Sequence, residues 1–243
     1  MIDGDWGDAD PNEPRNRRRR ASILVEHEAT IIVVDTGPDL REQLLDASPK
    51  RLDAVLYTHE HADHVHGIDD LRVYSWRQAG PLPTYMGAWM HDIMTRRFAY
   101  IFDPAKHMGR NAAPVMQAHI VVPYQPVAIG SMTVVPIQQD HGRRVSLGYR
   151  IGRFAYSTDV KHLDARALAA LAGIDIWVVD CLRLEPHPTH AHLDQVLRWR
   201  EIVEPGRVYL THMSHHMDYR SLCRSLPEGV EPAYDGLMFD VAP

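Results

Sequence analysis

Short apolar segments that each end near a histidine or an aspartate are the feature that most restricts the fold of this chain. "LYT" precedes His59, "VVPIQQD" precedes His141, "FAYST" precedes Asp159 and "VYLT" precedes His212. Apolar runs of this length are typical of buried strands, and the end of a strand in a rigid sheet holds the following loop residue in a fixed position. We therefore expect these four residues, which are far apart in the sequence, to share one edge of the sheets.

The order of the remaining segments predicts an α/β fold. Strands are expected first, and helices and strands then alternate, with helices in "LDARALAALA" and "LDQVLRWREIV" between apolar runs. This order suits sheets with helices outside them in one domain. We expect a single domain over residues 1–243, with an irregular segment over residues 1–20 and an insertion flanking the site over residues 76–126.

Composition excludes several classes of protein. The chain has 243 residues, of which 45% are hydrophobic and 24% charged, so it can bury a sizeable core. No apolar run approaches the roughly 18 to 20 residues of a membrane helix, and the polar N-terminus does not resemble a signal peptide. The net charge of −6 gives no global positive field for nucleic acid. We expect a cytoplasmic protein with no membrane partner, and nucleic acid is the less favoured partner.

The run "RNRRRR" over residues 15–20 is the local exception to this acidic balance. It is interpreted first as a solvated arm or a basic rim. The alternative interpretation is a contact for an anionic substrate or a phosphate.

Four metal-ligand side chains lie within six consecutive residues, in the pattern His-x-His-x-Asp-His. Neutral imidazole and carboxylate are the usual non-sulfur ligands of Zn²⁺ and similar ions. One tetrahedral ion cannot easily take four ligands from so short a segment, whereas two ions can divide them. His59 and His61 would then face one ion, and Asp63 and His64 the other. The candidates for the remaining ligands are His141, Asp159 and His212.

Taken singly, each of these three later residues could be an ordinary capping or hydrogen-bonding residue instead of a metal ligand. The cluster itself has no such simple alternative, because burying four unpaired polar groups in a dry core is costly.

The segment Thr58-His59-Glu60-His61-Ala62-Asp63-His64 resembles the signature of the metallo-β-lactamase fold superfamily of hydrolases. "QDHG", "YSTD" and "LTHMSH" match its later ligands in order, and the resemblance runs from about residue 22 to the end. It implies a four-layer αββα sandwich that holds two divalent metal ions, Zn²⁺ or Mn²⁺. By this resemblance, one ion is held by His59, His61 and His141, the other by Asp63, His64 and His212, and Asp159 bridges them.

Within the superfamily, the chain is most similar to the branch of tRNase Z and the phosphoribosyl 1,2-cyclic phosphate phosphodiesterases. That branch places a catalytic histidine before a helix and ahead of the last ligand, and His190 lies 22 residues before His212. His187 and His192 are neighbours that are easily confused with it. The resemblance implies catalytic roles for Asp63 and His190. Only a strand pair fits between His141 and Asp159, which is too short for the protruding arm of a bacterial tRNase Z.

We therefore expect a dinuclear hydrolase that cleaves a small phosphodiester of the cyclic nucleotide or ribose-phosphate type by attack of a metal-bridging hydroxide. The alternatives are a tRNase Z-like RNA endonuclease, a thioester or lactone hydrolase with the same metals, and a binding protein without turnover. A homodimer is also expected.

Three further residues are assigned more loosely. Asp35, at the end of "IIVVD", is expected to accept a hydrogen bond from a ligand histidine or simply to cap a turn. His192 and His215 are candidates for contacts with the substrate or with a ligand. His215 also matches a position that binds a structural zinc in some relatives, together with N-terminal cysteines. This N-terminal region has no cysteine, so no structural zinc is expected.

Overall fold

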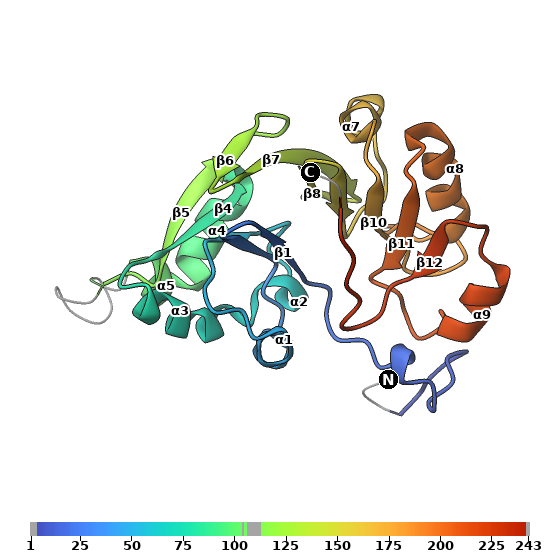
Figure 1. Cartoon of the computed structure of the whole chain (residues 1–243), viewed down its shortest axis with the longest axis horizontal. Coiled ribbons are helices and arrows are strands. Elements are labelled where there is room, and N and C mark those ends of the chain that lie inside the picture. Colours follow the sequence, from blue (N-terminus) through green and yellow to red (C-terminus); the bar gives the residue numbers. More distant parts are fainter. Residues whose placement is uncertain (1–3, 104, 106–112, 242–243) are drawn as a thin grey trace. The chain divides into compact units, whose positions relative to one another are not determined.

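The computed structural model describes residues 4–103, 105 and 113–241. The chain divides into two compact units (Figure 1). We call residues Arg20–Pro136 the N-terminal unit, and Ile137–Pro243 together with Met1–Arg19 the C-terminal unit. Each unit is described by itself.

The N-terminal unit is built on a five-stranded sheet with the strand order β1-β2-β3-β4-β5. β1 (Ile23–His27) and β2 (Thr30–Val34) form an antiparallel pair, and β3 (Ala54–Leu56), β4 (Leu82–Gly87) and β5 (Met116–Val121) continue the sheet in parallel. Every residue of β2 and β3 is buried. Strands of parallel pairs are commonly covered on both faces, which explains why their sequences are continuous apolar runs rather than alternating ones.

Short helices accompany this sheet. They are α1 (Leu40–Ala47), α2 (Ala62–Val65), the 3-10 helix η2 (Ile68–Leu71), α3 (Arg72–Arg77), α4 (Ala88–Arg97) and α5 (Ala99–Phe102). Their apolar residues and the sheet form one core cluster, which includes Tyr57, Met86 and Met90. Residues 76–126, expected to be an insertion, supply β4, β5, α4 and α5 and so contribute to this sheet and core. Whether the segment also flanks the site remains a prediction.

The C-terminal unit has a sheet in the order β12-β11-β10-β9-β8-β7. Its strands are β7 (Met132–His141), β8 (Arg144–Ile151), β9 (Phe154–Ser157), β10 (Ile176–Asp180), β11 (Arg207–Thr211) and β12 (Val230–Pro232), and β7 begins in the N-terminal unit, where it pairs with β6 (Val127–Ile129). β9 to β12 are parallel, so their carboxyl ends lie at the same edge. Asp159 and His212 follow two of these strands, as the pattern of strand ends predicts, and Asp180 ends a third.

The described part of the C-terminal unit also contains the helices α7 (Ala165–Leu171), α8 (Leu193–Val203) and α9 (Tyr219–Ser225). The N-terminal segment, with its 3-10 helix η1 (Pro14–Asn16), lies beside α9 (Figure 1), where Asn16 accepts a hydrogen bond from the Tyr219 N–H and donates one to Asp218. The expected α/β class is confirmed, since the chain forms two sheets with helices, consistent with the metallo-β-lactamase fold.

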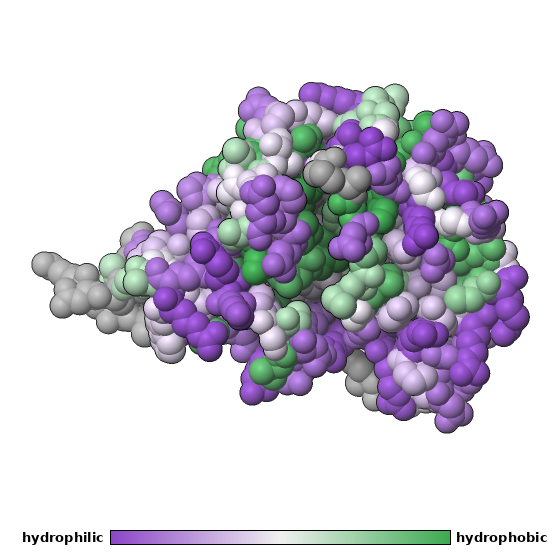
Figure 2. Space-filling view, viewed as in Figure 1, coloured by the Kyte–Doolittle hydropathy of each residue, from purple (hydrophilic) through white to green (hydrophobic). Residues whose placement is uncertain are grey.

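Hydrophilic residues occupy much of the face seen in Figure 2. Among the described residues, no helix combines the length and the apolar character that crossing a bilayer requires.

Candidate metal centre

A buried carboxylate organises the histidine cluster of the N-terminal unit. Asp35 directly follows β2 and is fully buried. It accepts hydrogen bonds from the Thr58 backbone N–H at 2.8 Å, from the Thr58 hydroxyl at 2.7 Å and from His64 Nδ1 at 2.7 Å. Burial raises the pKa of Asp35, although His64 and Thr58 act in the opposite direction. Because Nδ1 of His64 carries the donated proton, its Nε2 keeps a lone pair for a metal ion.

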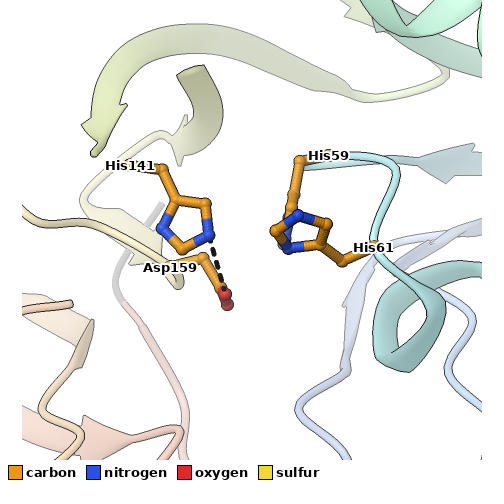
Figure 3. Close-up of side chains that lie close together, drawn as sticks. All are labelled: His59, His61, His141 and Asp159. Atoms are coloured by element: carbon orange, nitrogen blue, oxygen red, sulfur yellow. Dashed lines mark hydrogen bonds and ion pairs between the residues drawn. The ribbon is translucent and has the colours of Figure 1, made fainter. Parts of the chain in front are cut away.

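The same chain of hydrogen bonds continues to the first two histidines of the motif. The Thr58 hydroxyl donates to Asp35, so it accepts from His59 Nδ1 at 3.0 Å. His59 Nε2 then lies 2.9 Å from His61 Nδ1, and Figure 3 shows both side chains on the loop that follows β3. Asp63 Oδ2 is 3.6 Å from His64 Nε2. The four motif residues therefore present adjacent nitrogen and oxygen donors.

In the C-terminal unit, three imidazoles surround one carboxylate. Asp159 is buried, and its Oδ2 lies 3.6 Å from His141 Nε2, the pair joined by the dashed line in Figure 3. The same oxygen is 3.8 Å from His190 Nε2, while Oδ1 is 3.4 Å from His212 Nε2. The two oxygens thus face different histidines, an arrangement that would suit a carboxylate shared between two ions.

Two of the imidazoles around Asp159 form a hydrogen bond through Nδ1, the nitrogen that does not face this carboxylate. His141 Nδ1 donates to the Thr189 carbonyl at 2.8 Å. His190 Nδ1 contacts Asp180 Oδ2 at 2.8 Å, and this carboxylate, fully buried at the end of β10, also accepts from the Val160 N–H at 3.0 Å. Burial raises the pKa of Asp180, and the hydrogen bond with His190 acts against that rise. In both histidines Nε2 is the atom left to face Asp159.

Sequence analysis missed Asp180, although a usable signal was present. It ends the apolar run "IWVVD", just as Asp35 ends "IIVVD", and only the latter was selected. The two aspartates have the same role, because each forms a hydrogen bond with Nδ1 of one histidine in its own unit.

The distances around Asp159 fit ligands of a divalent metal better than direct hydrogen bonds. Nitrogen–oxygen hydrogen bonds are about 2.7–3.2 Å long, whereas two ligand atoms at about 2.0–2.1 Å from a tetrahedral ion lie about 3.3 Å apart. The separations of 3.4 Å to His212 and 3.6 Å to His141 are close to the second value. The donor set of imidazole and carboxylate suits Zn²⁺ or Mn²⁺.

His190 also meets the geometric condition for a ligand. Its ligand atom and those of Asp159 and His212 lie within 4.8 Å of one another. Its assignment as a catalytic residue rather than a ligand therefore remains a prediction, and metal content of a variant decides it.

The two loosely assigned histidines lie elsewhere in the C-terminal unit. His192 is the N-cap residue of α8 and forms a β-bridge with Arg183. The ring of His215 packs 4.2 Å from that of His216 and lies against Gly7. Within the described residues, the groups with metal-ligand spacing include neither of them.

Residues 15–19 of the basic run belong to the C-terminal unit and make specific contacts there. The Arg15 guanidinium lies over the rings of Tyr219 and Tyr234, at 4.8 and 5.0 Å from their centroids. Arg18 donates to the carbonyl of Met217 at 2.7 Å and is half-buried. Of the two interpretations given to this run, these contacts favour a basic rim over a phosphate contact.

Known proteins resemble this chain in sequence and in fold. A sequence model described as the beta-lactamase superfamily domain matches residues 30–213. A crystal structure of a new diphosphatase from the PhnP family is 33% identical, with a TM-score of 0.85, and the match covers 93% of this chain and 85% of that one.

Two curated relatives extend the comparison. An octanoyltransferase of Porphyromonas gingivalis is 34% identical over 91% of this chain and 45% of its own length. A ribonuclease Z of a Bradyrhizobium species is 29% identical over 67% of this chain and 52% of its own length. The chain thus spans about half the length of these curated relatives.

Proposed function

Because the chain belongs to the metallo-β-lactamase superfamily, we propose that it is a metal-dependent hydrolase of a small phosphodiester, of the cyclic nucleotide or ribose-phosphate class. The observation that carries the proposal is the Asp159 carboxylate, whose two oxygens face different imidazole nitrogens at 3.4–3.8 Å. A carboxylate in this setting is suited to join two cations.

Under this proposal, seven side chains hold two divalent ions, Zn²⁺ or Mn²⁺. They are the predicted ligands His59, His61, Asp63, His64, His141, Asp159 and His212. When bound, ions of this kind lower the pKa of water to near 7 and neutralise charge on phosphoryl oxygens. The buried Asp35 supports the assignment, because it fixes the Nδ1 proton of His64 and leaves Nε2 free of it.

His190 supplies the proton chemistry in this proposal. Its Nδ1 forms a hydrogen bond with the buried Asp180, and this bond orients the ring so that Nε2 lies toward Asp159. The ring then donates the Nε2 proton to the leaving oxygen, a role worth roughly 10²- to 10⁴-fold in rate. Asp63 is proposed to act at the same step as a ligand that orients the attacking water.

A small phosphorylated substrate is favoured over RNA by two observations. Only the short strands β8 and β9 and their turns lie between His141 and Asp159, so that segment holds no protruding arm for a large substrate. The diphosphatase relative, at 33% identity over most of both chains, also points to phosphorus–oxygen chemistry. A diphosphate bond therefore belongs in the substrate panel beside cyclic phosphates and simple diesters.

The proposal is tested by turnover of the metal-loaded protein on bis-p-nitrophenyl phosphate, cyclic ribose phosphates and nucleoside diphosphates. Asp159→Ala is expected to lose all metal-dependent activity. Asp175→Ala is the matched control, because Asp175 pairs with Arg153 on the surface of the same unit. Full activity of Asp159→Ala would rule the proposal out.

His190→Ala is the second variant of the test. It is expected to keep the bound metal, measured by mass spectrometry, and to lose most turnover. Loss of metal together with activity would make His190 a ligand and leave the proton donor unassigned.

Hydrolysis of an acyl thioester is a second candidate function, favoured by the 34% identity with a protein named octanoyltransferase. That relative is about twice as long as the matched region. Octanoyl thioesters added to the same panel decide between the candidates, since the better substrate class shows the higher kcat/KM. The proposed homodimer is tested by light scattering of the metal-loaded protein.

A further inference from the structure

A second imidazole accompanies His190 on the loop between β10 and α8. The ring of His187 lies 5.2 Å from that of His190, centroid to centroid, and His187 is partly exposed. We propose that His187 is a further substrate-contacting residue, which donates an uncharged N–H to an anionic oxygen of the substrate. This inference deepens the proposed function and rests on it.

The hydrogen bonds of His187 define which of its nitrogens is the donor. The Thr189 backbone N–H, which can only donate, points to His187 Nδ1 at 3.3 Å, and the Thr189 hydroxyl lies at the same distance. Nδ1 therefore accepts, and the neutral ring carries its proton on Nε2. Burial lowers the pKa of His187, and the neighbouring His190 and Arg183 lower it further, so the neutral form is favoured.

The loop is also rigid enough to hold a donor in place. Arg183 donates to the carbonyls of Glu185 and Pro186. The Thr189 carbonyl accepts from His141 Nδ1 at 2.8 Å, which ties the loop to the end of β7. A donor fixed by such supports loses little conformational freedom when an oxygen binds.

His187 and His190 thus have different chemistry. His190 has a buried carboxylate on Nδ1, which supports the proton-transfer role proposed for it above. His187 has an N–H donor on Nδ1, so its Nε2 donates without becoming charged. This division gives His190 the proton transfer and gives His187 the binding of a non-bridging oxygen.

Substitutions of His187 test the inference in the metal-loaded protein. The measurements are the Kd of inorganic phosphate by calorimetry, and kcat and KM for whichever substrate of the panel is hydrolysed fastest. His187→Ala is expected to raise both Kd and KM at least about tenfold, the effect of one hydrogen bond to a charged oxygen. His27→Ala, a surface histidine bonded to Ser131, is the control and should change neither.

A pair of amide variants separates a donor from a structural part of the loop. The amide N–H₂ of His187→Gln reaches about as far as Nε2, whereas that of His187→Asn lies nearer Nδ1. His187→Gln is therefore expected to recover most of the phosphate affinity, and His187→Asn is not. Equal weakness of the two amide variants, with a lowered unfolding midpoint, would overturn the inference in favour of a structural role.

The two proposals fail in distinguishable ways. Efficient phosphodiester turnover with wild-type KM and phosphate affinity in His187→Ala rejects the role of His187 and leaves the proposed function intact. Phosphate binding that depends on His187 without any diester turnover rejects the proposed function instead. Absence of phosphate binding by the wild-type protein rejects the inference.

Discussion

Replacing Gly142 by alanine is expected to disturb the loop that carries His187 and His190. Gly142 is the first residue after β7 and has a φ of +77°. A Cβ atom there would lie 2.8 Å from Thr189 Cγ2 and 3.2 Å from the Pro188 carbonyl oxygen. The loop packs directly against this glycine, so its position depends on the missing side chain.

The size of the displacement follows from these distances. Ordinary contact begins at 3.4 Å, so Thr189 must retreat by at least about 0.6 Å. If the whole residue moves along the direction of its 2.8 Å hydrogen bond from His141 Nδ1, that bond lengthens beyond the usual limit of about 3.2 Å. Because a misplacement of about 1 Å costs roughly 100-fold in rate, we expect kcat/KM to fall about tenfold or more.

Gly152→Ala is the matched control for this prediction. Gly152 also has a positive φ, +57°, but no atom within 4 Å of its added Cβ. Both variants therefore carry the left-handed backbone cost of about 1–2 kcal/mol, and only Gly142→Ala carries the collision. Unfolding in urea should show a further loss of about 1 kcal/mol for Gly142→Ala, from the weakened hydrogen bond. Equal kcat/KM in the two variants would refute the reasoning.

Three other substitutions test the buried carboxylates. Asp180→Asn keeps an oxygen acceptor for His190 but removes the charge, so kcat should fall about 10- to 100-fold with metal content unchanged; unaltered kcat would contradict it. Asp35→Asn should weaken the affinity for Zn²⁺ about 10- to 100-fold, because His64 loses its anionic partner; titration against a competing chelator measures this, and wild-type affinity would contradict it. Burial raises the pKa of Asp218, but its N–H donors outweigh burial and hold that pKa below the ordinary value. The Asp218 carboxylate therefore stabilises the fold above the unfolded pKa of about 3.9, and this advantage is lost as the pH falls through the lower folded pKa. Asp218→Asn should be about 1–2 kcal/mol less stable than the wild type at pH 7. This difference in the free energy of unfolding, measured in urea, should become smaller below about pH 4. A difference that stays constant with pH would contradict the assignment.

The family and the addresses of several site residues could be predicted from sequence because they depend on local pattern. The superfamily predicted from the motif that begins at His59 is confirmed by the match over residues 30–213. In the C-terminal unit, Asp159 and His212 lie at the same edge because β9, β10 and β11 are parallel. An apolar run followed by a ligand residue is visible in one sequence, and parallel pairing supplies the rest.

The hydrogen-bond partners of the histidine Nδ1 atoms could not be predicted in the same way. The Thr189 carbonyl that holds His141 is a backbone atom 48 residues away in the sequence. Any residue type provides such a carbonyl, so no motif marks it. The acceptor role of His187 Nδ1 likewise depends on the path of the backbone at Thr189 rather than on a residue pattern.

Asp35 and Asp180, the two aspartates at strand ends, could both have been selected from the sequence. A carboxylate at the end of a buried apolar strand is costly to desolvate unless several donors reach it. Asp35 receives two donors from Thr58 and one from His64, and Asp180 receives one from Val160 and one from His190. The cost of burial therefore implies a donor from elsewhere in the chain, and in a histidine-rich protein an imidazole Nδ1 is a prime candidate. Applied evenly to "IIVVD" and "IWVVD", that argument selects both aspartates and predicts a supported histidine in each unit.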